Sequence, residues 1–158
     1  MKKAVAIGEL LIDFVPQQKG CALDEVQQFE RVAGGAPANV ATAVARLGGE
    51  AKMISQVGED AFGHLLLGTL NAAGIETRGI RVDDSVFTTL AFVTFDAQGD
   101  RSFSFARKPG ADTRLTWEEV DTALIDEAKV FHFGTLSLTD EPVRTATRKA
   151  VAYAKEHG

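Results

Sequence analysis

Two consecutive glycines, Gly34 and Gly35, lie just before an expected helix start and are the residues of this sequence best placed to do chemistry. Ala36 and Pro37 follow them, and Asn39 falls within the first helical turn. Glycine leaves backbone N–H groups without a Cβ beside them, and a helix N-terminus carries partial positive charge. This start suits an oxygen-rich ligand such as a phosphate, a carboxylate or the hydroxyls of a sugar. A tight strand-to-helix connection that binds nothing is an equal alternative.

Two further side chains narrow this choice of ligand. Asn39 supplies an amide that can donate to or accept from a hydroxyl, and Asp13 supplies a carboxylate shortly after the first expected strand. The chain has neither a G-x-G-x-x-G run after that strand nor a G-x-x-x-x-G-K-[ST] loop. Because a carboxylate would repel a phosphate, the combination favours a polyol. Taken alone, Asp13 is more typical of a turn or cap.

The elements that must position these residues alternate between strand and helix. Apolar runs at 4–7, 52–57 and 129–133 predict buried parallel strands. Pro37 suits the first turn of a helix, Asp60 and Asp140 can cap helices, and Thr116 with Glu119 has the spacing of a capping box. This alternation predicts an α/β protein with a mostly parallel sheet.

The middle of the chain departs from this rhythm. Residues 86–96 are rich in β-branched and aromatic side chains, and after a Gly-containing loop Phe103 and Phe105 alternate with serines. Period two on both sides of a loop predicts an antiparallel hairpin. We therefore expect a small β-sheet appended to the α/β unit.

Composition excludes several classes of partner. The net charge is −5 and no basic cluster offsets it, which argues against nucleic acid. No apolar run is long enough to span a membrane. Cys21 is the single cysteine, so we expect a reducing, cytoplasmic setting without an intrachain disulfide. The chain stops just after a helix with no return strand, so we expect an N-terminal part of a longer protein.

One long segment carries a family resemblance. The run GGAPANVATAVARLGG at 34–49, with Gly58 following, resembles the N-terminal signature of PfkB-type carbohydrate kinases, the ribokinase family. The segments 8–14, 58–63, 105–112 and 130–138 are similar to the same family, the last two most of all to its fructokinase branch. Ala36 stands where ribokinase typically has a lysine, so ribose is disfavoured.

The resemblance implies a doubly wound α/β fold with a β-sheet lid, formed by strands around 12–32 and 86–107 of a unit covering 1–158. It also implies transfer of the ATP γ-phosphate to a sugar hydroxyl, with Mg²⁺ bridging the phosphates. Substrate-binding positions of the family map onto Asp13, Gly34, Gly35, Asn39, Phe103 and Arg107. For Phe103 a place in the lid core, and for Arg107 a solvated strand end, are equal alternatives.

The family's catalytic motifs do not occur in this sequence. There is no Gly-Ala-Gly-Asp run and no Asn-x-x-Glu motif. Asp112, in a superficially similar PGAD run, precedes no helix start, so we do not assign it as the base. The three histidines lack metal-ligand spacing. We therefore expect no catalytic or metal-binding residue here, an absent C-terminal ATP-binding half, and no activity from this chain alone.

Several alternatives stay open. Fructose is the first candidate substrate, and 2-keto-3-deoxygluconate, ribose or a nucleoside could replace it. A non-catalytic sugar-binding or interaction module is the alternative from another class. The resemblance also implies that a homodimer could form through the lid. Gly134 and Thr135, at the carboxyl end of the strand at 129–133, are expected near the sugar by topology.

Overall fold

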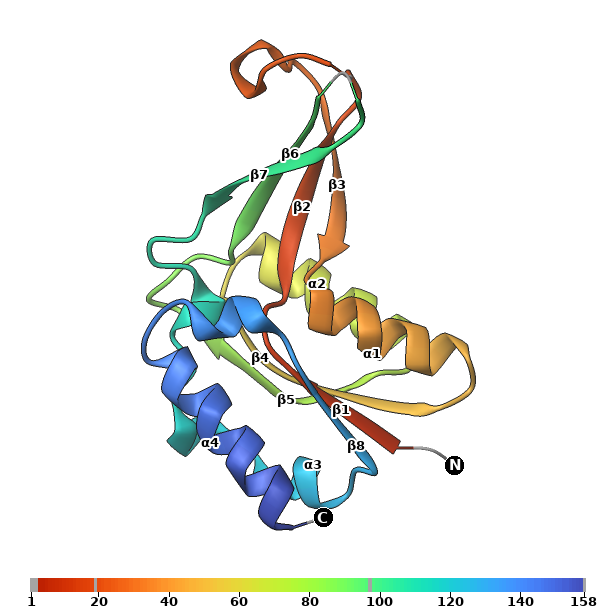
Figure 1. Cartoon of the computed structure of the whole chain (residues 1–158), viewed down its shortest axis with the longest axis vertical. Helices are drawn as coiled ribbons and strands as arrows, with labels where there is room; N and C mark the ends of the chain where they lie inside the picture. Colours follow the sequence, from red (N-terminus) through yellow and green to blue (C-terminus); the bar gives the residue numbers. More distant parts are fainter. Residues whose placement is uncertain (1–2, 19, 97, 158) are drawn as a thin grey trace.

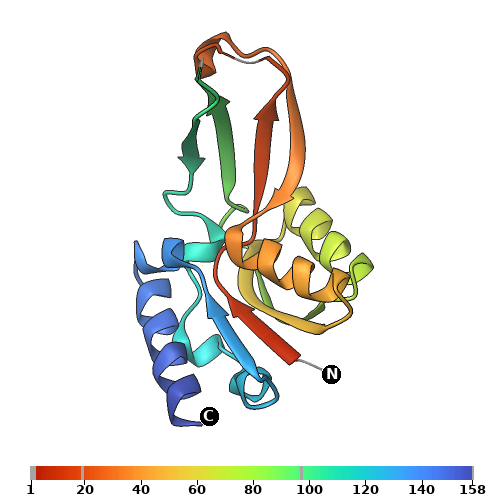
Figure 2. The ribbon, with the colours of Figure 1, turned by 45° about the vertical axis from the view of Figure 1, so that its right-hand side comes forward.

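The described residues form two four-stranded sheets with helices around the first, and the second sheet stands above the first (Figure 1, Figure 2). The computed structural model describes residues 3–18, 20–96 and 98–157. Ala97, in the loop of the expected hairpin, lies outside these ranges. Among the described residues, no helix has the length and apolar character needed to cross a bilayer.

The first sheet is parallel and buried on both faces. Its strands run in the order β5 (Glu76–Asp83), β4 (Glu50–Gly58), β1 (Lys3–Ile7), β8 (Val130–Phe133). On β1 the side chains of Val5 and Ile7 belong to one core cluster and that of Ala6 to the other. Because successive strand residues point to opposite faces, a continuous apolar run serves a sheet that is covered twice.

Helices cover each face. On one side α1 (Ala36–Arg46) and α2 (Ala61–Ala72) bury Ala41, Leu66 and Leu70 against Met53 of β4. On the other side α4 (Val143–Glu156) and the short α3 (Thr122–Asp126) pack on the sheet. The remaining short helices are 3₁₀ turns: η1 (Leu23–Glu25), η2 (Ala111–Thr113), η3 (Trp117–Glu119) and η4 (Thr135–Leu138). This arrangement confirms the doubly wound α/β fold.

The second sheet is mixed, with the order β3 (Phe29–Gly34), β2 (Leu11–Pro16), β6 (Leu90–Phe95), β7 (Arg101–Ala106). Strands β6 and β7 form the expected antiparallel hairpin, and β2 runs parallel to β6. On one face Phe14 stacks on Phe92 with ring centroids 5.1 Å apart and meets Phe62 of α2 edge-on. This aromatic cluster joins the second sheet to the first helical layer.

Most predicted elements are confirmed, and the exceptions have physical reasons. The Asp60 side chain caps α2 as expected, accepting from the N–H groups of Phe62 and Gly63. The capping box at Thr116 forms but opens only a 3₁₀ turn. The prediction that Asp140 caps the last helix was wrong: Pro142 holds the N-cap position, and the Asp140 carboxylate accepts instead from Thr139 and Arg107.

Candidate functional site

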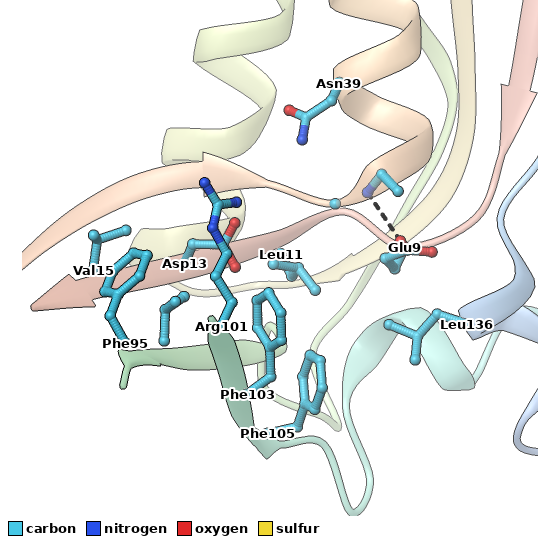
Figure 3. Close-up of a pocket in the computed structure, with 13 residues that line it drawn as sticks. Glu9, Leu11, Asp13, Val15, Asn39, Phe95, Arg101, Phe103, Phe105 and Leu136 are labelled. Atoms are coloured by element: carbon cyan, nitrogen blue, oxygen red, sulfur yellow. Dashed lines mark hydrogen bonds between the residues drawn. The ribbon is translucent and has the colours of Figure 1, made fainter. Parts of the chain in front are cut away.

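A cavity of about 350 Å³ lies where the second sheet meets the carboxyl edge of the first (Figure 3). Strand β1 ends at Ile7 and leads into Glu9, while β8 ends at Phe133 and leads into η4. Open α/β sheets bind ligands outside the carboxyl ends of their strands. The residues that line the cavity come from the segment after β1, the start of α1, η4 and the second sheet: Glu9, Leu11, Asp13, Val15, Gly35, Ala36, Asn39, Val93, Phe95, Arg101, Phe103, Phe105 and Leu136.

Strand period explains which residues of the second sheet face the cavity. Leu11, Asp13 and Val15 of β2 line it, whereas Ile12 and Phe14 between them pack on the aromatic side. On β7 the same alternation places Arg101, Phe103 and Phe105 on the face that lines the cavity. One face of this sheet therefore packs against the hydrophobic core, and the other face lines the cavity.

Glu9 is the most buried carboxyl group of the cavity, with 4% of its surface exposed. Its Oε1 accepts a hydrogen bond from the Ala36 N–H at the start of α1, 2.9 Å away. Burial raises the pKa of Glu9, although the N–H groups of Glu9 and Ala36 act to lower it. Sequence reasoning missed this residue; the available signal was a glutamate inside the apolar run at 4–12.

Asp13 lies half-buried on β2, as its alternation requires, and its side chain points into the cavity beside Arg101 (Figure 3). Burial raises the pKa of Asp13, and the Arg101 guanidinium partly offsets this. Arg101 also lies over the Phe95 ring, 5.7 Å from its centroid. Arg101 was not predicted as a site residue, because an arginine at a hairpin strand carries no sequence signal for a site.

The two glycines have roles that differ from their expected one. A Cβ at Gly34 would overlap the Asp13 carboxylate, and a Cβ at Gly35 would overlap the Glu9 carbonyl oxygen. Gly35 also has φ of +106°, which disfavours other residues. Gly35 lines the cavity, and Gly34 does not. The absent side chains therefore make room for the protein's own carboxylate and carbonyl groups.

Asn39 and Phe103 reach the cavity from opposite sides. Asn39 is exposed on the first turn of α1. Phe103 is 50% exposed and stacks on Phe105, with centroids 5.9 Å apart. Phe103 is thus no core residue of the second sheet; its ring forms a wall of the cavity.

Arg107 lies outside the cavity lining and is almost completely buried. Its Nε donates to Asp112 at 2.8 Å, and its Nη atoms donate to Thr139, Asp140 and the Leu136 carbonyl. The alternative of a solvated strand end is therefore wrong. Arg107 connects the end of β7 to η4, whose Leu136 lines the cavity.

Gly134 and Leu136 are the residues after β8 that approach the site. A Cβ at Gly134 would lie 2.7 Å from Glu9 Oε2 and 2.6 Å from Pro37 Cγ, so this glycine lets the β8 end pack against the start of α1. Thr135 does not line the cavity. In the described part of the chain, no three His, Cys, Asp or Glu side chains gather into a group that could hold a metal ion.

Comparison with known proteins agrees with this architecture. The chain matches the family model described as "pfkB family carbohydrate kinase" over residues 1–158. A fructokinase from Solanum tuberosum is 50% identical over 154 residues, which are 98% of this chain and 48% of that protein.

Two solved structures are also similar. A sugar kinase from Pyrococcus horikoshii superposes with a TM-score of 0.93 at 35% identity, covering 99% of this chain and 51% of that one. A fructokinase from Xylella fastidiosa with bound ATP gives 0.87 at 39% identity, covering 99% and 46%. The chain thus spans about half the length of the relatives it matches. Since the family match extends from the first residue to the last, this chain belongs to the pfkB family of carbohydrate kinases.

Proposed function

We propose that the full-length protein transfers the γ-phosphate of ATP to a hydroxyl of a sugar, with fructose as the first candidate. This chain supplies the sugar-binding cavity, and the second sheet acts as its lid. The observation that carries the proposal is a cavity of about 350 Å³ whose polar groups, Glu9, Asp13 and Asn39, sit beside the aromatic wall of Phe103. Hydroxyl groups bind carboxylates and amides, and the apolar face of a sugar ring packs on an aromatic side chain.

The charges around the cavity favour a neutral sugar over a sugar acid. Glu9 and Asp13 both line it, and among the described residues Arg101 is the one cationic side chain that does so. Arg107, the arginine that could pair with a substrate carboxylate, already forms ion pairs with Asp112 and Asp140. A 2-keto-3-deoxygluconate carboxylate would therefore meet like charge.

ATP enters the proposal through the family and through the Xylella fastidiosa fructokinase, which was solved with ATP. Mg²⁺ is implied by the family resemblance alone. Among the described residues, no three His, Cys, Asp or Glu side chains form a group that could hold a metal ion, and the proposal gives these residues no step of phosphoryl transfer. Their contribution is to hold and orient the acceptor, which is a large part of catalysis in reactions of this class.

Phosphorylation assays on the full-length protein test the proposal. Fructose, ribose, 2-keto-3-deoxygluconate and a nucleoside are compared with ATP as donor, for wild type and for Asp13→Asn. We expect fructose to be preferred and Asp13→Asn to lower kcat/KM for the sugar by about 10- to 100-fold, the value of a hydrogen bond to a charged group. No phosphorylation of any of the four would overturn the proposal, and an unaffected Asp13→Asn would remove Asp13 from the site.

We also propose that the second sheet can pair with a second copy. All six residues of β7 are exposed, and β7 is an edge strand with Phe103 and Phe105 on one face. Exposed edges and apolar patches favour association. Light scattering of the full-length protein tests this; we expect a dimer that Phe105→Glu converts to a monomer.

A further inference from the structure

The second carboxylate oxygen of Glu9 has no hydrogen-bond partner although it is buried. Three buried side-chain oxygens in the described ranges share this property, those of Glu9, Gln56 and Thr147. Of these residues, only Glu9 carries a carboxylate and lines the cavity. A buried carboxylate without a partner is costly, so such a group is expected where a ligand completes its bonding.

Asp112 is a buried carboxylate with a purely structural role, and its hydrogen bonds differ from those of Glu9. Asp112 is as buried as Glu9, and both of its oxygens are bonded, one to Thr89 and one to Arg107. Glu9, in contrast, uses Oε1 for the Ala36 N–H and leaves Oε2 free. Capping α1 requires one acceptor oxygen, so capping alone does not account for a second, charged one.

Glu9 Oε2 is itself buried, and it lies next to the backbone of Gly134. A Cβ added at Gly134 would lie 2.7 Å from this oxygen, so a larger residue there would crowd it. Glu9 sits at the end of the cavity near Leu136, whereas Asp13 sits on the second sheet (Figure 3). Two acidic groups thus face one cavity from two different elements.

We infer that Glu9 is a second sugar-contacting residue, whose Oε2 accepts a hydrogen bond from a sugar hydroxyl different from the one that Asp13 binds. The inference rests on the proposed function and adds a specificity to it. The sugar must carry hydroxyls toward both ends of the cavity, and an analogue that lacks the hydroxyl facing Glu9 leaves this oxygen unpaired again.

The experiment combines Glu9→Gln with monodeoxy analogues of the preferred sugar, using the full-length protein. Glutamine keeps the shape of the side chain and an acceptor for the Ala36 N–H while removing the charge. Glu118→Gln, at an exposed glutamate outside the cavity lining, is the matched control. Calorimetric affinities and KM values for sugar and for ATP are measured, with melting temperatures of the unliganded proteins.

We expect Glu9→Gln to weaken binding of the sugar by about 10- to 100-fold, as loss of a charge-assisted hydrogen bond does, with the KM for ATP unchanged. In wild type, the monodeoxy analogue lacking the hydroxyl at Glu9 should bind less tightly by a similar factor, and Glu9→Gln should abolish that difference. The melting temperature of Glu9→Gln should equal or exceed that of wild type, because a costly buried charge is gone.

Other outcomes separate the two proposals. If wild type phosphorylates a sugar but Glu9→Gln binds all analogues with wild-type affinities, or loses the same factor for every analogue together with a lower melting temperature, Glu9 has only a structural role and the inference is overturned. If wild type neither binds nor phosphorylates any sugar, the proposed function itself fails.

Discussion

Replacing glycine by alanine has opposite consequences at Gly34 and at Gly68. A Cβ at Gly34 would overlap the Asp13 carboxylate, whereas a Cβ at Gly68, exposed in α2, meets nothing within 4 Å. We expect Gly34→Ala to destabilise the fold by about 1–3 kcal/mol through overpacking. Gly68→Ala should stabilise it by about 0.5–1 kcal/mol through helix propensity. Urea unfolding measures both, and destabilisation by Gly68→Ala would contradict the open space around it.

The titration of single carboxyl groups predicts how stability depends on pH. Burial raises the pKa of Glu9 and of Asp13, so folding favours their protonated forms, and their contribution to stability is lost as pH rises through these raised values. Hydrogen bonds from Lys52 and Arg78 lower the pKa of Glu127 to about 2, so its contribution is lost as pH falls toward that value.

Unfolding free energies measured across the pH range check these signs. In Glu9→Gln the decline of stability as pH rises through the raised Glu9 pKa should become shallower, while the loss of stability in acid persists. In Glu127→Gln the acid loss should shrink instead. An unchanged profile in both variants would contradict the two directions.

Sequence reasoning found the cavity residues that stand next to recognisable patterns. Asp13, Gly35, Asn39 and Phe103 line the cavity, and each belongs to a motif or an alternating strand. Glu9 was missed because burial and a missing partner are properties of the folded chain. The bonds of Arg107 could not be predicted either, since Asp112 and Asp140 come near it only after the chain has folded.

At the scale of elements, Arg107 holds the end of β7 against η4. Its guanidinium bonds Asp112, which is 4% exposed, and the carbonyl of Leu136. We expect Arg107→Met to destabilise the protein by about 3–5 kcal/mol, because it leaves a buried carboxylate unpaired. Thermal unfolding measures the loss, with Arg144→Met as control.

The control tests whether the burial of the pair matters. Arg144 pairs with Glu141 at 2.7 Å, and both side chains are exposed, by 42% and 46%. Its loss should cost at most about 1 kcal/mol. If Arg107→Met were as mild as Arg144→Met while sugar affinity fell, Arg107 would be a substrate contact rather than a structural connection.

Elements with a single clear signal were predicted well, and those that depend on distant partners were not. Helix α2 follows its Asp60 cap, and the β6–β7 hairpin follows its alternation. Strand β5 was not predicted, because most of its residues are polar or charged. Gly79 and Ile80, which pair with β4, are its two buried positions. The local sequence pattern predicts an edge strand poorly when the register of that strand depends on the neighbouring strand.

Across the whole molecule, protection from solvent differs strongly between the two sheets. Strand β4 is buried at every residue after the first, whereas β7 is exposed throughout. We expect amide hydrogen exchange to be slowest in β1 and β4 and fastest, among the strands, in β7. Saturating sugar should slow exchange in β7 selectively. Uniform protection of both sheets, or no response of β7 to sugar, would contradict a cavity closed by the second sheet.

The alternation within the second sheet limits how its sequence can drift. Inserting or deleting one residue inside β2 would exchange Asp13 for Phe14 on the face toward the cavity, and the same event in β7 would turn Phe103 and Phe105 away from it. Insertions and deletions in related sequences should therefore accumulate in the turns between strands, while the number of residues in β2 and β7 stays the same.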